Sequence, residues 1–429
     1  MASWLSWKER ELARVVPFEG IHYNTSRFGK DVSRLVAPPY DVIDPLMERK
    51  LKDDRLNFTH LTLGNEDDRY CVVSRRLETW LDDEVLVRDG EKNFYIYEQT
   101  FLSPDGKIRV RSGIVGLVRL EEFSSGIVMP HEKTIPKHKE DRLELKMAAR
   151  GDLEQILLLY DDASGSIERM ILESRKREEE LRFVDLEGVN HRIIRITDPK
   201  LVEEISNLFT DVKLLIADGH HRYEVGLEYS RGQDDPSLGP RGERPCDFIL
   251  ATLVSFRNPG LVIFPTHRLI KGVGQKLLEG LPKNLEKDFI LQKAASVDKL
   301  ASDVEASSQG SFGVWIPSSE TLLLATPRVP EESKDPMKSI PVCVVQERVL
   351  RKLLKYTDEM LEKKINIEYV KGTGPTKAAM DSGEYQACFF VKPPSPEQVM
   401  AVARTGQKMP HKSTYFSPKI WSGTLLYLH

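Results

Sequence analysis

Short apolar runs alternate with segments of helical spacing along almost the whole chain, and this alternation constrains the fold most. Runs rich in β-branched and aromatic residues at 94–101 and 108–118, separated by a Pro-Asp-Gly turn, predict a β-hairpin. The continuously apolar run at 248–256 predicts an interior strand, because a strand covered on both faces shows no polar alternation. Helical spacing at 70–86 and 166–181 separates such runs. We therefore expect a mixed α/β (α+β) fold with a mixed sheet.

A change of pattern after about residue 271 predicts two domains. Beyond it, helix-like segments at 274–281 and 297–306 alternate with strands at 312–316 and 321–325, which is a compact arrangement of its own. We expect an N-terminal α/β domain and a second, smaller α/β module whose last segment could pack back on the first domain. The boundaries that we assign are 1–271 for the first domain, 272–429 for the module and about 405–429 for its last segment.

Composition and charge restrict the classes of function. The 429 residues carry 62 Lys and Arg against 66 Asp and Glu, a net charge of −4, so no overall positive field attracts nucleic acid or an anionic membrane. No apolar stretch is long enough to cross a bilayer, and the first residues lack the apolar core of a secretory signal. The four cysteines form no C-x-x-C pair, which argues against a disulfide scaffold and a cysteine zinc site. We expect a cytoplasmic protein without a membrane or nucleic-acid partner.

The densest group of chemically active side chains lies at 217–224, which read Ala-Asp-Gly-His-His-Arg-Tyr-Glu. The apolar run at 212–216 predicts a short buried strand before it, and 225–231 predicts a helix after it. At a strand-to-helix junction the first N–H groups of the helix are unpaired and the macrodipole is positive. An anion such as phosphate would be favoured there.

A purely structural role for the same motif is the alternative. Asp218 would then be an N-cap, and Gly219 would permit a tight turn. Such a cap gives no reason for the consecutive His220, His221 and Arg222. We therefore favour an anion site, with the acid, both imidazoles and the guanidinium as candidate site residues.

A second motif, Pro-His-Glu-Lys-Thr at 130–134, places an imidazole, a carboxylate and an ammonium beside one another. Prolines bracket it, so it belongs to a loop or a strand end. Glu132 could act as a general base or a metal-binding carboxylate with Lys133 as its electrostatic partner. A solvated charged loop is an equally good interpretation of this motif alone.

In the segment 36–43, two prolines halt a short apolar strand, and Tyr40 and Asp41 follow them on a rigid turn. Rigid display suits a site residue, but it also suits an ordinary Asx turn or a helix cap, and the residues alone favour the structural interpretation.

Near the C-terminus, 409–419 combines lysine, hydroxyl and aromatic side chains between prolines. Lys412, Ser413 and Thr414 could hold a phosphate or a carboxylate, and Tyr415 or Phe416 could cover an adenine. The segment lacks the glycine-rich start of a Walker A loop, so its pattern does not imply nucleotide binding.

The histidines do not suggest zinc. No His-x-x-x-His pair occurs, and adjacent His220 and His221 at a helix start point about 100° apart, so they cannot easily chelate one ion. A hard cation such as Mg²⁺, held by Asp218, Glu132 or the phosphates of a substrate, fits the oxygen ligands better.

Taken together, these motifs resemble the domain-of-unknown-function family 1015, in the same order and over nearly the whole chain. The motifs that carry the resemblance are 37–43, 131–134, 217–224 and 409–416. The Asp-Gly-His-His-Arg core is also similar to the phosphate-binding box of the ParB and sulfiredoxin superfamily, which includes nucleotide-dependent kinases of free L-serine. That box normally has Arg where His221 stands, so the exact mechanism does not transfer.

The resemblance implies a ParB/sulfiredoxin-like core and a division of roles. Asp218 or Glu132 would accept the hydroxyl proton of serine or hold Mg²⁺. The phosphate donor would be ATP, ADP or pyrophosphate. The residues implied to hold phosphate or nucleotide are Gly219, His220, His221, Arg222, Lys133, Lys412, Ser413 and Thr414, with His220 and His221 also taking part in catalysis. Tyr40, Asp41 and His131 would contact the substrate.

Three functions remain open from the sequence. The first is a phosphotransferase that converts a small hydroxylated metabolite, best L-serine, to its phosphate ester. The second is a non-catalytic, ParB-like protein that senses a nucleotide through the same phosphate site. The third is a phosphohydrolase that uses a metal-bound water.

Overall fold

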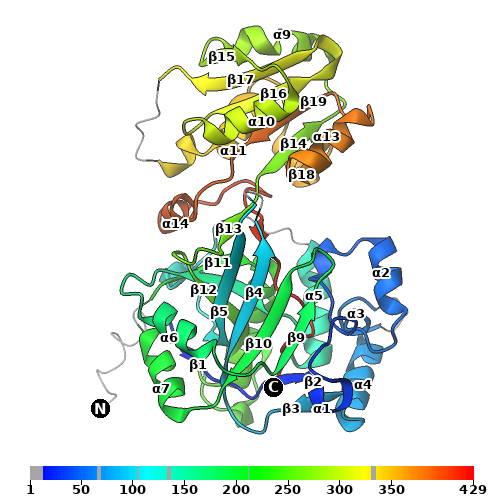
Figure 1. The fold of residues 1–429 in the computed structure, drawn as a ribbon, viewed down its shortest axis with the longest axis vertical. Helices are drawn as coiled ribbons and strands as arrows, with labels where there is room; N and C mark the ends of the chain where they lie inside the picture. The colour runs from blue at the N-terminus through cyan, green and yellow to red at the C-terminus, as the bar shows by residue number, and fades with distance from the viewer. Residues whose placement is uncertain (1–12, 65–68, 104–105, 133–136, 211, 330–334) are drawn as a thin grey trace. The chain divides into compact units, whose positions relative to one another are not determined.

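The computed structural model describes residues 13–64, 69–103, 106–132, 137–210, 212–329 and 335–429, and the chain divides into two compact units (Figure 1). Unit 1 contains Met1–Pro130, Thr134–Val262 and Pro418–His429, and unit 2 contains His131–Lys133 and Ile263–Ser417. The division falls before the expected boundary at residue 271. The reason is that β14 (Thr266–Ile270) pairs with two strands of the sheet of unit 2.

Unit 1 is built on a mixed sheet of nine strands within the described residues, with β1 pairing to β5 beside the main path. Strand β11 is parallel to β6 and β12 is parallel to β8, whereas the other neighbours are antiparallel. The order is β6 (Val128–Met129), β11 (Leu214–Asp218), β8 (Ile156–Tyr160), β12 (Phe248–Ser255), β5 (Ile108–Arg119), β4 (Phe94–Leu102), β10 (Asn190–Ile196) and β9 (Leu181–Val184), with β1 at Val15–Val16. The expected mixed α/β class is confirmed, and so are the hairpin of β4 and β5 and the interior strand β12, which is buried along its whole length.

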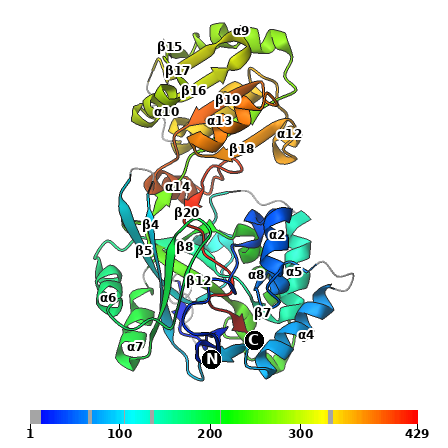
Figure 2. The same ribbon diagram turned by 45° about the vertical axis from the view of Figure 1, so that its right-hand side comes forward.

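The two faces of this sheet differ in chemistry. Paired residues share a face, so Ile96 and Ile114 lie on one side and Gln99 and Arg111 on the other. The first side forms the apolar core with helices α6 (Ser166–Ser174) and α7 (Pro199–Leu208), which lie together beside the sheet in Figures 1 and 2. The second side carries buried polar side chains. The C-terminal segment, red in Figure 2, runs along unit 1 to the small strand pair β7–β21.

The remaining elements of unit 1 are helices and two-stranded pairs. Helix α8 begins at His220, five residues earlier than the sequence indicated, so both histidines and Arg222 belong to its first turn. Tyr223 is fully buried, and its hydroxyl exchanges two hydrogen bonds with the backbone of Glu121, which fixes the helix to the protein core. The elements are α1 (Thr25–Phe28), α2 (Pro45–Lys52), α3 (Thr59–Thr62), α4 (Arg69–Asp82), α5 (Lys137–Ala149), α8 (His220–Gly232), β2 (Ile21–Tyr23), β3 (Leu86–Arg88), β7 (Gly151–Asp152) and β21 (Tyr427–Leu428).

Unit 2 contains a second sheet, of six strands in the described residues, and each neighbouring pair is antiparallel. The expected smaller module with strands near 312–316 and 321–325 is confirmed, because short apolar runs separated by a turn define these two strands. The strand order is β15 (Phe289–Lys293), β17 (Thr321–Pro327), β16 (Phe312–Ile316), β19 (Ala387–Val391), β14 and β18 (Ile367–Lys371). Its helices are α9 (Gln275–Leu285), α10 (Val297–Ala306), α11 (Pro341–Val344), α12 (Asp358–Glu362), α13 (Thr373–Asp381) and α14 (Pro396–Arg404).

No helix among the described residues has the length and apolarity that a bilayer span requires.

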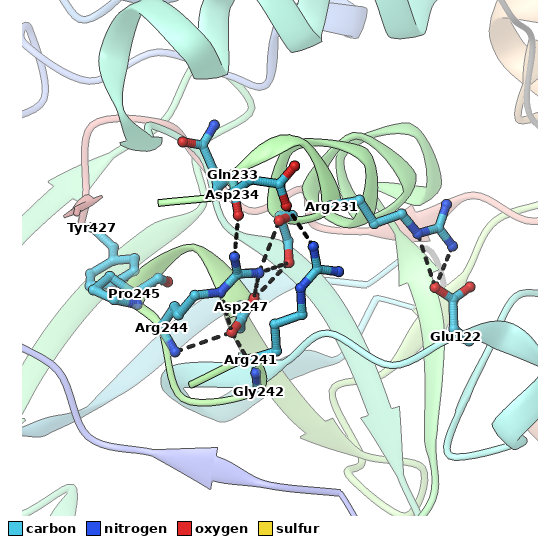
Figure 3. A network of polar contacts seen from close by, with 11 residues as sticks. Glu122, Arg231, Gln233, Asp234, Arg241, Gly242, Arg244, Pro245, Asp247 and Tyr427 are labelled. Atoms are coloured by element: carbon cyan, nitrogen blue, oxygen red, sulfur yellow. Dashed lines mark hydrogen bonds and ion pairs between the residues drawn. The ribbon is translucent and has the colours of Figure 1, made fainter. Parts of the chain in front are cut away.

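A buried ion pair fastens the loop that follows α8 (Figure 3). Arg244 and Asp247 are 3% and 5% exposed, so each charge needs a partner. Asp247 accepts hydrogen bonds from the Arg244 guanidinium at 2.6 and 3.0 Å, from Ser230 Oγ at 2.7 Å and from the Gly242 N–H at 2.6 Å. Burial alone would raise the pKa of Asp247, but these hydrogen bonds outweigh it and lower the pKa to about 2.

This depressed pKa predicts a loss of stability in acid. The charged form of Asp247 is favoured in the folded state, so its contribution is present above the unfolded pKa of 3.8 and is lost as the pH falls towards about 2. Asp247→Asn should lower the free energy of unfolding by about 2 kcal/mol at neutral pH. Urea denaturation of both proteins from pH 7 to pH 3 measures this difference. A difference that stays constant over that range would rule out the ionised carboxylate as its source.

Candidate functional site

The junction between β11 and α8 shapes the main candidate site in unit 1. The register of β11 against β8 shifts between Ile216 and Asp218, an irregularity of the kind that re-aims side chains near functional sites. Gly219 follows with φ +92° and occupies the N-cap position of α8. The cap role considered for Asp218 is wrong, because Gly219 is the N-cap residue and no side chain caps the helix. A Cβ on Gly219 would lie 2.6 Å from Ile156 Cγ2, so this position requires glycine for space as well as for conformation.

Asp218 lies among cations at the end of its strand. Its Oδ2 is 3.1 Å from Nζ of Lys419, and the two side chains are 22% and 13% exposed. Its charge helps to raise the pKa of Arg222 and opposes the lowering of the pKa of Arg111 by burial, so both guanidinium groups lie within electrostatic range. The carboxylate is therefore partly shielded from water and lies among several positive charges.

Arg222 connects the helix terminus to the rest of the site. Its Nη1 donates a hydrogen bond to the backbone oxygen of Gln155. Burial alone would lower the pKa of Arg222, but the carboxylates of Glu154, Asp218 and Asp41 help to raise it above its ordinary value. Arg222 therefore stays charged beside the first turn of α8.

The turn at Tyr40 and Asp41 lies in the same unit as this motif and close to Arg222. Both residues belong to a short 3₁₀ helix, Tyr40–Val42, and both help to raise the pKa of Arg222. The Tyr40 N–H donates to Glu154 Oε1 at 3.3 Å, and the Arg142 guanidinium lies 4.2 Å from the centre of the Tyr40 ring. Burial raises the pKa of Tyr40 to about 12, so its hydroxyl is protonated at neutral pH. Asp41 is exposed.

Four residues of this cluster were not predicted as site residues. Glu154 and Arg142 are buried and lie in segments with no recognisable motif. Arg111 stands in a strand that the sequence showed only as an apolar hairpin. Lys419 is 201 residues from its partner Asp218. It ends the segment 409–419, in which only earlier residues were predicted as ligands. Only the Pro-Lys ending of the segment 409–419 could have pointed to it.

Unit 2 brings together the two other motifs. His131 is fully buried, and its Nε2 lies 2.9 Å from Thr414 Oγ1. Glu132 forms a parallel bridge with Met409, and its Oε1 accepts the Lys412 N–H at 3.1 Å. His131 and Glu132 thus hold the turn that follows 409, although 280 residues separate Glu132 from Lys412.

Within that turn the candidate phosphate ligands differ in exposure. Lys412 adopts φ +57° and is exposed, which displays its ammonium to solvent. Ser413 is buried, and its hydroxyl donates to the Pro410 oxygen at 2.6 Å. Arg268, also buried, donates to the Lys412 oxygen at 3.1 Å and places a second fixed cation behind the turn. Lys133, the remaining predicted ligand of this group, lies outside the described residues.

The protein's own ligands do not form a ready metal site at Asp218 or Glu132. In the part of the chain that the structure describes, one group of three possible ligands converges, and it consists of His22, Asp89 and Glu180. Arg195 pairs with both of these carboxylates, and the pKa of His22 is raised, so an imidazolium ion-pair network explains the group. Asp218 faces cations instead. A magnesium ion at this position would need the oxygens of a bound phosphate as further ligands.

Comparison with known proteins agrees with the motif pattern. The model of one family, described as a protein of unknown function (DUF1015), matches residues 15–363. No curated protein matches the sequence.

Solved structures show only a weak likeness. A free serine kinase in complex with AMP has 15% identity and a TM-score of 0.37, over 70% of this chain and 86% of that chain. A conserved hypothetical protein from Pyrococcus furiosus has 18% identity and a TM-score of 0.35, over 71% and 91%. SbnI with C-terminal truncation from Staphylococcus aureus has 11% identity and a TM-score of 0.35, over 71% and 84%. At TM-scores below 0.5, these neighbours carry no inference about activity.

Proposed function

This chain belongs to the DUF1015 family, and we propose that it is a phosphotransferase. It would phosphorylate a small hydroxylated metabolite, with free L-serine as the acceptor and O-phosphoserine as the product. The donor would be ATP, ADP or pyrophosphate. One observation carries the proposal: the N-terminus of α8, capped by a glycine, lies beside a carboxylate and several fixed cations.

The helix terminus and the cations suit a transferring phosphoryl group. Backbone N–H groups of the first turn and the helix dipole favour negative charge, and α8 is 13 residues long. Arg222 and Lys419 would neutralise charge that spreads over the phosphoryl oxygens in a loose transition state. His220 and His221, in the same first turn, would add hydrogen-bond donors.

Asp218 is the proposed general base. The serine hydroxyl would give its proton to the carboxylate as its oxygen attacks phosphorus, and the bond from phosphorus to the donor's leaving oxygen would break. The leaving group keeps the electron pair of that bond. Tyr40 and Asp41, which lie close to Arg222, would bind the amino group of the acceptor. A bound magnesium ion would supply charge neutralisation on the donor phosphates.

The cluster of unit 2 has proposed roles of its own. Glu132 is the alternative base or magnesium ligand, and Lys412 and Thr414 would contact phosphate or carboxylate oxygens. Ser413 would shape the turn through its bond to Pro410 and offer its remaining acceptor positions. His131, buried against Thr414, would position the substrate-binding turn. Lys133 completes the set as a proposed phosphate contact.

Product formation tests the proposal. Purified protein is incubated with Mg²⁺, L-serine and one of ATP, ADP or pyrophosphate, and O-phosphoserine is measured by mass spectrometry. We expect product with at least one donor and none without serine. Failure of all three donors, with a nucleotide still raising the melting temperature, would favour a nucleotide sensor. Release of inorganic phosphate without any acceptor would favour a phosphohydrolase.

A further inference from the structure

We infer that Lys419 is a phosphate-binding residue of the site in unit 1, that residues 418–424, here called the strap, are built to present it, and that Arg111 supports it as a buried cation. This inference rests on the proposed function, because it assumes that a phosphoryl group binds at the N-terminus of α8.

Backbone contacts fix the strap on both sides of Lys419. The oxygen of Pro418 accepts a hydrogen bond from Arg111 Nη2, and the oxygen of Lys419 accepts one from Gln99 Nε2 at 2.7 Å. Further along, the Trp421 N–H donates to the Tyr97 hydroxyl at 3.2 Å. These three donors and acceptors stand on β4 and β5, so the strap crosses the polar face of the central sheet.

The far end of the strap is tied to the candidate site itself. Ser422 exchanges two backbone hydrogen bonds with Ala37, at 2.8 and 3.2 Å, and so joins the strap to the motif that carries Tyr40. The Ser422 hydroxyl donates to Glu154 Oε1 at 2.7 Å, the same oxygen that accepts the Tyr40 N–H. The backbone around Lys419 is thus held in place, and its side chain reaches Asp218 from this fixed position.

Arg111 provides the second observation. It is 1% exposed, and in the described structure its Nη1 is buried without a hydrogen-bond partner. A buried guanidinium nitrogen without a partner is costly, so such atoms usually have a role. Burial lowers the pKa of Arg111 to about 10, and the carboxylate of Asp218 opposes that shift. The guanidinium is therefore still charged at neutral pH, within electrostatic range of Asp218.

The charges favour an anion at this place. Lys419 pairs with Asp218, and Arg222 and Arg111 lie within electrostatic range of the same carboxylate, while Glu154 and Asp41 also act on Arg222. A phosphate oxygen beside Lys419 would bring negative charge close to these cations, and a compact ammonium on a flexible stem can contact both the carboxylate and a phosphate. In this arrangement Lys419 moves with the phosphoryl group while Asp218 receives the acceptor proton.

The test compares Lys419→Met with Lys213→Met, which makes the same change at an exposed lysine directly before β11. The affinity for pyrophosphate is measured by calorimetry at two salt concentrations. We expect Lys419→Met to weaken binding by about 10- to 100-fold, Lys419→Arg to restore most of it, and Lys213→Met to match the wild type. Equal affinities of the wild type and Lys419→Met would overturn the inference while leaving the proposed function intact.

A second measurement on the wild-type protein remains valid if the methionine variant does not fold. Reductive methylation of lysines is followed by peptide mass spectrometry with and without pyrophosphate. Lys419 should be protected by the ligand, and Lys213 should react at the same rate in both samples. Binding of pyrophosphate without protection of Lys419 would contradict the inference. Absence of any pyrophosphate or nucleotide binding to the wild type would instead count against the proposed function, and the inference would fall with it.

Discussion

Asp218→Asn is expected to lower the turnover of phosphoryl transfer by about 10²- to 10⁴-fold, the usual contribution of a positioned general base. Asparagine has nearly the same shape but cannot accept the proton of the acceptor hydroxyl. Its amide oxygen can still accept a hydrogen bond from Lys419, so the fold should lose only about 1 kcal/mol of stability. Rates of O-phosphoserine formation and urea denaturation of the same samples measure the two quantities separately.

The matched comparison is Glu132→Gln in unit 2. Glu132 Oε1 accepts the Lys412 N–H, and the glutamine amide keeps an oxygen for this bond, so the turn should be preserved. If Asp218 is the base, Asp218→Asn should lose much more turnover than Glu132→Gln. A large loss confined to Glu132→Gln would transfer the role to Glu132. Near-normal rates in both variants would show that neither carboxylate has the proposed role.

Gly219→Ala is expected to destabilise unit 1 by about 2–4 kcal/mol, through a left-handed backbone and a steric clash together. Gly219 has φ +92°, and an added Cβ would lie 2.6 Å from Cγ2 and 2.9 Å from Cβ of Ile156, a strand residue that cannot retreat easily. Relief of this clash would shift the first turn of α8, so phosphate binding should weaken as well.

Gly232→Ala is the control for this variant, because it makes the same change at the other end of α8. An added Cβ at Gly232 meets no atom within 4 Å, and its φ is not in the left-handed region. Alanine is also the better helix former, so stability should be unchanged or slightly higher. Urea denaturation measures the free energy of unfolding of both variants. Similar stabilities for the two variants would mean that the start of α8 tolerates a side chain.

Local patterns predicted the elements and the place of the main motif. The hairpin of β4 and β5, the buried β12 and the strands β16 and β17 follow from apolar runs and turns that lie within a few residues of one another. The junction at 217–224 was visible for the same reason. The start of α8 was placed too late, because two histidines and an arginine give little apolar period to mark a first turn.

Contacts between distant segments could not be predicted. The residues near Asp218 do not predict its ion pair with Lys419. The residues near His131 do not predict its contact with Thr414, which lies 283 residues later. The sheet order of unit 1 interleaves strands from its whole length, so the polar face that holds the strap exists only after folding. The pairing of β14 with two strands of unit 2 is likewise a contact between distant segments, and it places the division between the units before the expected residue 271.

The most direct test of a phosphoryl-transfer site at α8 is a crystal structure of the protein with pyrophosphate or a non-hydrolysable ATP analogue and L-serine. We expect phosphate oxygens within hydrogen-bond distance of the backbone N–H groups of His221 and Arg222, with the Lys419 ammonium in contact with them. A phosphoryl group bound elsewhere, for example against Lys412 and Thr414 in unit 2 while the first turn of α8 stays empty, would contradict this expectation.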